Sequence, residues 1–360
     1  MAPGWGKMIA LSFTDSYSNT SMVKVGIIGA SGYTGAELLR LCAQHPEVEV
    51  VAATGDSQAG TLASHLYPSL AAAYPNLVFE EFAVDRFAGL DVVFLGIPHE
   101  AALEIAPQLV GKVGTVIDLS AAYRLKDSSL YPTWYGFDHT QPELLASAVY
   151  GLPELYRSEL VGASLIATPG CYVTAASLAL TPLVRSGIVQ SQGVIVDAAS
   201  GVSGAGRALK HTSLFSTVDE DFTAYGLLDH RHTPEIEQVT GAQVLFTPHL
   251  VPMNRGILAT CYVRPAGAAP TTASLLASIA TFYKDEPFIV VRPQVPSTKA
   301  TLGTNCVHIT ARFDERTGYV MVLAALDNIA KGASGGAVQS MNVALGLPET
   351  SGLSTVGVYP

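Results

Sequence analysis

The residue with the clearest chemical potential in this sequence is a cysteine in the segment TPGCYVT, residues 168–174. Pro169 and Gly170 predict a turn, and the apolar run after Cys171 predicts the start of a helix. A helix N-terminus carries unpaired N–H groups and a partial positive charge, which lower a thiol pKa below its usual value of about 8.5. Because the thiolate is the reactive form, Cys171 is a candidate nucleophile. The alternative is a small buried residue that caps the helix.

The other cysteines, Cys42, Cys261 and Cys306, lie in apolar runs where packing explains them. The four are far apart and lack paired C-x-x-C spacing, so we expect no zinc site, no iron–sulfur cluster and no other metal centre. Four cysteines in 360 residues also fit a reducing compartment better than a disulfide-built secreted fold. These observations favour a cytoplasmic protein.

Histidines that can serve the thiol occur in the segment DHRHTPEI, residues 229–236. Pro and Glu at positions 234 and 235 suit the first turn of a helix that Thr233 would cap. In an extended stretch successive side chains alternate, so we expect His230 and His232 to point to opposite sides and only one to serve the thiol. His232 is our candidate, since a histidine can deprotonate a thiol and later protonate an oxyanion. A packing or capping role is the alternative.

A strand–turn–helix unit opens the ordered part of the chain. Residues 22–28 read as a β-branched strand, and glycines at positions 29, 32 and 35 precede a helical run at residues 36–41. Glycines at this spacing allow a tight reversal and let a pyrophosphate approach free N–H groups at the helix start. The motif G-x-x-G-x-x-G is a variant of the dinucleotide fingerprint and is weak evidence when it stands alone.

The following strands strengthen this interpretation. Apolar runs at residues 48–53, 91–96 and 113–118 alternate with helical segments, which predicts a parallel sheet covered on both faces and a Rossmann-type first domain. An acidic residue normally ends the second strand of NAD-binding domains, but Asp56 lies beyond that position and no Arg or Lys stands there for a 2′-phosphate. The residues therefore do not decide between NAD and NADP, and Thr54, Ser57 and Gln58 are neutral candidates for the adenosine end.

Loops after the third and fourth strands lie where doubly wound sheets bind ligands. They supply Pro98, Ser120 and Arg124; Ser120 suits the nicotinamide end, and the Arg124 guanidinium can clamp a substrate carboxylate. Alternatively, Ser120 caps the turn that follows it, and Arg124 forms an ion pair on the surface. A further loop, SGVSGAGR at residues 200–207, can hold an anion beside Arg207, or can be a flexible hairpin.

The second half of the chain has a different pattern. Strand-like runs at residues 194–198, 243–246, 256–263, 288–291, 307–313 and 319–325 predict a mainly antiparallel sheet, so the whole reads as a Rossmann domain plus an α+β domain. The net charge of −10 argues against nucleic acid or an anionic membrane as partner, and no run approaches the ~20 apolar residues of a membrane span. Residues 1–21, rich in Ser, Thr and Gly, predict a disordered extension.

Six motifs in one order resemble those of the N-acetyl-γ-glutamyl-phosphate reductases, the arginine-pathway members of the aspartate-semialdehyde dehydrogenase-like reductases. The resemblance runs from about residue 23 to the C-terminus. The motifs are GASGYTG (29–35), PGCYVT (169–174), SGAGR (203–207), HRHTPE (230–235), FTPHLVPMNRG (246–256) and DNIAKG (327–332). One departure is Gly336, where many relatives carry glutamine, so any contact of that side chain is in doubt.

This resemblance implies an oxidoreductase that uses NADP(H) to reduce a small acyl phosphate to an aldehyde, with Cys171 forming a thioester and His232 as the acid–base residue. It also implies an NADP-binding domain at residues 22–169 and 327–360, a catalytic and dimerisation domain at 170–326, and a homodimer or homotetramer. Cofactor contacts fall on Asn328 and on the turn formed by Gly29, Ala30, Ser31, Gly32, Tyr33 and Thr34. Predicted substrate contacts are Arg124, His230, Glu235, Ser203, Gly204 and Arg207, the last receiving the departing phosphate.

Three other functions fit parts of the pattern. One is a reductase of lysine or ornithine biosynthesis, which acts on a carrier-protein-linked aminoadipyl or glutamyl phosphate. Such an enzyme needs a basic docking surface, and the acidic net charge of this chain gives no indication of one. Aspartate-semialdehyde dehydrogenase is disfavoured by the segment at residues 230–235. A non-catalytic redox sensor would bind dinucleotide and act through Cys171 without turnover.

Overall fold

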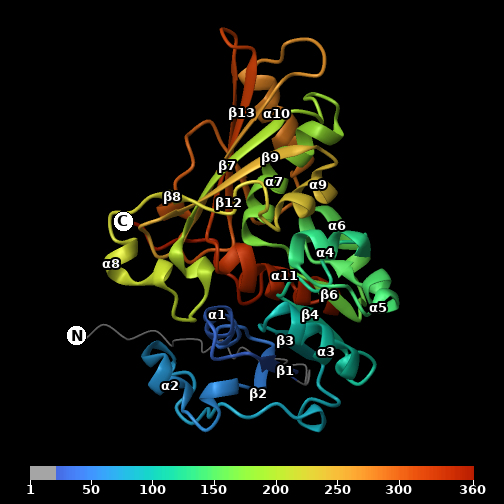
Figure 1. The fold of residues 1–360 in the computed structure, drawn as a ribbon, viewed down its shortest axis with the longest axis vertical. Coiled ribbons are helices and arrows are strands. Elements are labelled where there is room, and N and C mark those ends of the chain that lie inside the picture. Colours follow the sequence, from blue (N-terminus) through green and yellow to red (C-terminus); the bar gives the residue numbers. More distant parts are fainter. Residues whose placement is uncertain (1–21) are drawn as a thin grey trace, which may run out of the picture.

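Two sheets form the framework of the computed structural model, which describes residues 22–360. The predicted disordered extension at residues 1–21 lies outside the described residues. Figure 1 shows the first sheet at the bottom of the molecule and the second at the top, with α11 between them. No helix within residues 22–360 combines the length and hydrophobicity that a bilayer span requires.

The first sheet is six-stranded, parallel throughout and ordered β2-β1-β3-β4-β6-β5. Its central strands are buried on both faces: every residue of β3 and β4 is buried, and β3 is apolar throughout. Its strands are β1 Val23–Ile28, β2 Val48–Ala53, β3 Val92–Leu95, β4 Thr115–Asp118, β5 Val149–Tyr150 and β6 Leu165–Ala167. The α-helices of this part are α1 Tyr33–Cys42, α2 Ala63–Leu66, α3 His99–Leu109, α4 Tyr131–Tyr135, α5 Pro142–Ser147 and α6 Pro153–Leu160.

The second sheet is seven-stranded and mixed, with the order β11-β12-β13-β10-β7-β9-β8. Most neighbours are antiparallel, but β7 pairs with β9, and β11 with β12, in parallel. The strands are β7 Val194–Gly201, β8 Thr223–Ala224, β9 Val244–Val251, β10 Ile257–Val263, β11 Ile289–Val291, β12 Val307–Asp314 and β13 Tyr319–Leu326. The α-helices that follow β6 in the chain are α7 Cys171–Arg185, α8 Phe215–Val218, α9 Thr233–Thr240, α10 Thr272–Phe282 and α11 Gly335–Leu345.

One face of the second sheet packs on helices, and α7 is one of them. Strand β10 alternates between buried and half-buried residues, and its buried side chains share one core with α7, α9 and α10. Helix α7 is buried along nearly its whole length, which its run of alanine and leucine permits. Because α7 follows β6 after a short turn, its N-terminus lies at the carboxyl edge of the parallel sheet.

The chain returns to the first sheet at its C-terminal end. A π-helical turn, Ala330–Ser334, leads into α11, and side chains of α11 such as Val338 and Met341 belong to the same core as β1 and α1. The domain boundaries at 169/170 and 326/327 stay predictions.

Candidate active site

Cys171 is the first residue of α7, and this helix has no capping side chain of its own. Its N-cap residue, Gly170, offers no side chain, and the first turn has no acidic residue. The first N–H groups of α7 therefore lie beside the thiol, as helix geometry requires. Cys171 is half-buried, whereas Cys42, Cys261 and Cys306 are buried.

Two glycines allow other parts of the chain to close around Cys171. A Cβ atom at Gly170 would lie 2.3 Å from His232 Nε2, so the imidazole covers the N-cap residue of α7. On the other side, a Cβ atom at Gly332 would lie 2.8 Å from the Cys171 Cβ. Cys171 thus follows a residue that the imidazole covers, and it packs against the backbone of the π-helical turn. Neither approach tolerates a side chain without movement.

A buried network holds the loop that leads into Cys171. The Gly170 N–H donates to Glu235 Oε1 at 3.0 Å, and the Tyr150 hydroxyl donates to the same oxygen at 2.5 Å. Arg124 Nε donates to the Thr168 carbonyl oxygen at 2.7 Å. The loop is therefore held on both sides, by a carboxylate and by a guanidinium that come from distant segments. Sequence reasoning missed Tyr150, which has no motif around it.

Arg124 lies buried beside the loop that leads into Cys171. Its side chain is only 8% exposed, and Nη2 donates to the Leu119 carbonyl oxygen at 2.9 Å in addition to the bond to the loop. Nη1 lies 3.5 Å from Glu235 Oε2, a buried oxygen without a hydrogen-bond partner among residues 22–360. Backbone carbonyls thus bind Nε and Nη2, and the alternative of a surface ion pair is wrong because the side chain is buried. Contact between Arg124 and a substrate carboxylate stays a prediction. The guanidinium turns inward because its partners are backbone carbonyls of the β4 and β6 loops.

The electrostatics of the thiol also differ from the expectation. Burial raises the pKa of Cys171 to about 11, although backbone N–H groups at the start of α7 and the Arg124 guanidinium act in the opposite direction. The predicted helix effect is present, but desolvation outweighs it. In the free protein at neutral pH the Cys171 thiol is therefore protonated, and a base must remove its proton during reaction.

The two histidines lie together, so the prediction of opposite sides is wrong. Their ring centroids are 4.7 Å apart, and the His232 N–H donates to His230 Nδ1 at 3.1 Å. The reason is the backbone: His232 has helical angles, φ −80° and ψ −12°, and is itself the N-cap residue of α9 in place of Thr233. His230 packs against Tyr172 and Phe246, while His232 is the ring beside Gly170.

Both imidazoles are neutral at physiological pH. Burial lowers the pKa of His230 to about 4, and burial together with the neighbouring His230 and Arg124 lowers the pKa of His232 well below its ordinary value. His232 Nδ1 is buried with no hydrogen-bond partner among the described residues. A neutral imidazole can accept a proton at one nitrogen and donate one at the other.

The predicted dinucleotide turn has the geometry that a pyrophosphate requires. Gly29 has φ +85°, and a Cβ atom at Gly35 would lie 2.4 Å from the Gly29 carbonyl oxygen. The N-cap residue of α1, Gly32, brings no capping side chain, and the first turn has no acidic residue. The first N–H groups of α1 are thus available to an anionic ligand. These observations fit the nicotinamide dinucleotide cofactor that the family resemblance implies.

Other predicted cofactor residues lie at the carboxyl ends of the parallel strands. Thr54 Oγ1 accepts the Gly29 N–H at 3.1 Å, so this hydroxyl supports the glycine turn. The Ser120 hydroxyl donates to Asp118 Oδ2 at 2.8 Å. Ser57 and Pro98 lie at the same edge of the sheet, where Ser57 is exposed.

The loop at residues 200–207 lies beside the dinucleotide turn, and its role in binding the substrate phosphate stays a prediction. Arg207 Nε donates to the Ser31 carbonyl oxygen at 2.8 Å, and Ser203 Oγ accepts from Asn328 Nδ2 at 3.0 Å. A Cβ atom at Gly204 would lie 3.6 Å from the same amide nitrogen of Asn328. The loop contacts the residues predicted for the cofactor because β7 ends against the 251–256 segment, which positions it over α1.

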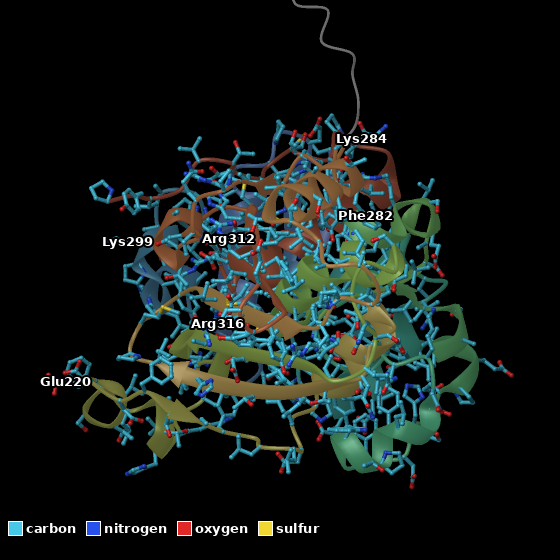
Figure 2. The ribbon with its side chains drawn as sticks, turned by 90° about the horizontal axis from the view of Figure 1, so that it is seen from above. Glu220, Phe282, Lys284, Lys299, Arg312 and Arg316 are labelled. Carbon is cyan, nitrogen blue, oxygen red and sulfur yellow. The ribbon has the colours of Figure 1, made fainter. Side chains whose placement is uncertain are left out.

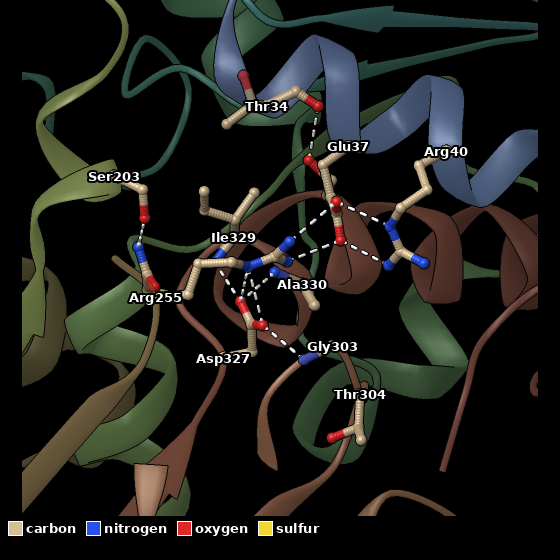
Figure 3. A network of polar contacts seen from close by, with 12 residues as sticks. Thr34, Glu37, Arg40, Ser203, Arg255, Gly303, Thr304, Asp327, Ile329 and Ala330 are labelled. Atoms are coloured by element: carbon tan, nitrogen blue, oxygen red, sulfur yellow. Dashed lines mark hydrogen bonds and ion pairs between the residues drawn. The ribbon is translucent and has the colours of Figure 1, made fainter. Parts of the chain in front are cut away.

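An ion network joins α1 to the second sheet and was missed by the sequence reasoning (Figure 3). Arg255 Nη2 donates to Glu37 Oε1 at 2.8 Å, and its Nε lies 3.0 Å from Asp327 Oδ2. Arg40 donates to the same carboxylate of Glu37. Burial raises the pKa of Glu37, but the two guanidinium groups outweigh burial and hold it below its usual value. No local signal predicts pairs this far apart in the sequence.

Comparison with known proteins now places the chain in a family. Residues 24–163 match the family described as "Semialdehyde dehydrogenase, NAD binding domain", and residues 171–328 match "Semialdehyde dehydrogenase, dimerisation domain". An N-acetyl-gamma-glutamyl-phosphate reductase of Symbiobacterium thermophilum is 49% identical, covering 94% of this chain and 99% of that protein. The enzyme of the same name from Citrifermentans bemidjiense is 47% identical, covering 94% and 100%. The chain belongs to the N-acetyl-gamma-glutamyl-phosphate reductase family.

Solved structures agree with the fold of this family. Aspartate semialdehyde dehydrogenase II from Vibrio cholerae, complexed with ASA, has a TM-score of 0.65 at 15% identity. The match covers 90% of this chain and 98% of that protein. The Candida albicans aspartate semialdehyde dehydrogenase with NADP has a TM-score of 0.66 at 17% identity, with the same coverage. Membership of the reductase family rests on the sequence relatives, and the predicted resemblance is confirmed.

Proposed function

We propose that this protein reduces N-acetyl-γ-glutamyl phosphate to N-acetylglutamate 5-semialdehyde and phosphate with NADPH, a step of arginine biosynthesis. The single observation that carries the proposal is the position of Cys171. It lies at the uncapped start of α7, directly after the residue that His232 covers and against the Gly332 backbone. The nearly half-identical relatives, which align over 94% of the chain, support this substrate and do not favour the carrier-linked reductase or the redox sensor.

The first half-reaction is acyl transfer to Cys171. The sulfur attacks the acyl carbon, the carbon–oxygen bond to phosphate breaks, and a thioester remains on the protein. Because burial keeps the pKa of the thiol high, attack requires a proton acceptor, and His232 is neutral and lies against the residue before Cys171. Arg124, whose positive charge favours the thiolate, and Glu235 hold the loop in place.

The second half-reaction reduces the thioester. NADPH, when bound, supplies the hydride. The first N–H groups of α7 are placed to stabilise the oxyanion of the resulting thiohemiacetal, and His232 can protonate or hydrogen-bond it. Collapse of the thiohemiacetal breaks the carbon–sulfur bond, releases the aldehyde and returns the thiol of Cys171. The cycle leaves the protein unchanged.

Residues around the glycine turn would hold the cofactor. The turn at residues 29–34 suits the pyrophosphate, and Asn328 with Ser203 suits the nicotinamide end because this pair connects the turn region to the π-helical turn that packs on Cys171. The match to an NAD-binding domain supports a nicotinamide dinucleotide in general. The choice of NADPH over NADH rests on the family resemblance.

We infer that two copies associate through the uncovered face of the second sheet. Residues that alternate with the buried core positions are half-buried in the single chain, and most are apolar. They include Ile195, Leu258, Tyr262, Met321 and Leu323. The adjoining segment that ends in β8 also exposes apolar side chains, Phe215 being 82% exposed, and Figure 2 shows Glu220 at its outer tip. The match of residues 171–328 to a dimerisation domain supports a homodimer or a homotetramer built from it.

The reverse reaction tests the proposed function. NADP reduction is followed with N-acetylglutamate semialdehyde, with and without phosphate, for the wild type and Cys171→Ser. We expect turnover that requires both phosphate and Cys171, and slower turnover with NAD. Turnover without phosphate would refute acyl-phosphate chemistry. An inactive wild type that still binds NADP would refute the proposed substrate.

A further inference from the structure

Lys331 is a buried cation that the proposed mechanism does not use. Its side chain and that of Glu154 are both fully buried, and Nζ donates to Glu154 Oε1 and to Gln339 Oε1, each at 2.5 Å. Gln339 Nε2 donates to the same Glu154 oxygen at 2.9 Å. Removing an ammonium group from water costs several kcal/mol unless it is paired and hydrogen-bonded. A lysine held in this way has a fixed position, unlike one on the surface.

The backbone that carries Lys331 is a π-helical turn with wide hydrogen bonds. The Gly332 N–H donates to the Asp327 carbonyl oxygen at 3.0 Å, and the Ser334 N–H donates to the Ile329 carbonyl oxygen at 2.8 Å, each five residues back. Such turns are rare and often occur at functional sites. The wider turn moves Gly332 outward, onto the residue that begins α7.

This one turn contacts two parts of the site and is held at its start by Asp327. Its Gly332 backbone packs on Cys171, because a Cβ atom at Gly332 would lie only 2.8 Å from the Cβ of that cysteine. Its Ser334 hydroxyl donates to the Thr34 carbonyl oxygen at 2.8 Å, within the dinucleotide turn. Asp327 holds its start by accepting the N–H groups of residues 329 and 330, and Figure 3 shows this carboxylate beside Arg255. Lys331 is the side chain that fixes its middle.

We propose that Lys331 is a positioning residue: by binding Glu154 and Gln339 it pins the π-helical turn, and Gly332 thereby sets the distance between Cys171 and the dinucleotide turn. Lys331 touches neither substrate nor cofactor in this role. The inference rests on the proposed function for its kinetic consequence, but the placement of the thiol can be measured without turnover.

A generic buried ion pair is the competing explanation, and the chain offers a matched control. Arg157 is at the outer edge of the same cluster, where it pairs with Glu286 and Glu349 and is 39% exposed. Glu349 Oε1 accepts from Gln339 Nε2 at 2.8 Å, so the two cations share a network. The hydrogen bonds and ion pairs of Arg157 go to these two carboxylates rather than to the π-helical turn. Replacing Arg157 therefore disturbs the ion cluster but leaves the contacts of Lys331 with Glu154 and Gln339 in place.

The experiment compares Lys331→Met/Glu154→Gln, Gln339→Met and Arg157→Met. The double variant removes both buried charges, so no unpaired ion is left. Gln339→Met keeps the ion pair but removes one acceptor of Lys331, together with the Gln339 hydrogen bonds to Glu154 and Glu349. It is the fallback variant if the double variant does not fold. For each variant, kcat and KM of the reverse reaction are measured, along with the rate at which iodoacetamide alkylates each cysteine, resolved by peptide mass spectrometry.

We expect kcat to fall about 10- to 100-fold in the double variant and less in Gln339→Met, with KM for the semialdehyde little changed, since a nucleophile displaced by about 1 Å loses this much. Alkylation of Cys171 at pH 8 should become faster as the turn loosens, while Cys261 in the core stays slow and reports an intact fold. Arg157→Met should match the wild type.

Folded variants with unchanged kcat and unchanged Cys171 alkylation would overturn the proposal, and so would an equal loss in Arg157→Met. If the wild type itself lacks reductase activity, the proposed function fails, and the alkylation series still decides whether Lys331 positions the thiol.

Discussion

Replacing Gly170 by alanine tests the contact between the nucleophile loop and His232. Gly170 has φ −65° and ψ 146°, angles that alanine adopts freely, so the change adds no backbone strain. The added Cβ atom would lie 2.3 Å from Nε2, 2.6 Å from Cε1 and 2.7 Å from Cδ2 of the imidazole. Optimal separations between such atoms are about 3.5–4.0 Å. The ring or the loop must therefore move by about 1 Å.

The imidazole has little room to move. The ring centroid of His232 lies 4.7 Å from that of His230 and 5.9 Å from that of Tyr172. Overpacking of this kind costs about 1–3 kcal/mol of the free energy of unfolding. A displacement of about 1 Å of a catalytic group lowers kcat by about 100-fold. We expect both effects in Gly170→Ala.

A double-mutant cycle separates this clash from any other effect of the substitution. The free energy of unfolding is measured by denaturant titration for the wild type, Gly170→Ala, His232→Ala and the double variant. In the His232→Ala background the added methyl group meets no ring, and alanine restricts the unfolded chain, so Gly170→Ala should be neutral or stabilising by up to about 1 kcal/mol. Gly267→Ala is the matched control, since no atom lies within 4 Å of its Cβ position among the described residues.

The reasoning is refuted if Gly170→Ala destabilises the protein equally with and without the His232 ring. Wild-type kcat in Gly170→Ala would also refute it, because it would mean that the ring position does not matter to the reaction.

Three further predictions concern buried titratable groups. Because burial raises the pKa of Cys171 to about 11, its alkylation rate in the free enzyme should rise about tenfold per pH unit above pH 7, and a plateau by about pH 9 would contradict this. Tyr150→Phe removes a donor to the Glu235 carboxylate and should lower the free energy of unfolding by about 1.5–3 kcal/mol in denaturant titrations; no loss would refute the role of this bond. Burial raises the pKa of Asp118 from 3.8 to about 6, so between these values the folded chain binds more protons than the unfolded chain and stability falls as pH rises. Asp118→Asn should remove this fall, which amounts to at most about 3 kcal/mol, and an unchanged pH profile would argue against it.

Much of the fold could be predicted because its strands are encoded locally. Apolar, β-branched runs in the sequence predicted β1 to β4 of the first sheet, and β7 and β9 to β13 of the second. The sequence reasoning missed β5, β6 and β8, which are two or three residues long. Strands this short are stabilised by their neighbours in the sheet, so their own residues carry little signal. The parallel pairing of β7 with β9 likewise depends on the connection through α9.

The chemical parts of the site are encoded in short stretches of sequence. A turn of proline and glycine before Cys171, glycines at every third position from Gly29, and a histidine before a helix are features of a few neighbouring residues, and such features follow from local backbone geometry. Their order along the chain also sufficed to predict the family, which the relatives confirm.

How these parts act together depends on contacts that form only in the folded protein. Burial from distant segments reversed the expected direction of the Cys171 pKa, and a turn before α9 brought the two histidine rings together. Arg124 turned inward to backbone carbonyls, and the loop of Arg207 lies on the dinucleotide turn. Desolvation and charge pairing depend on which residues meet in space, and residues distant in the sequence supply them, so local sequence patterns do not reveal them.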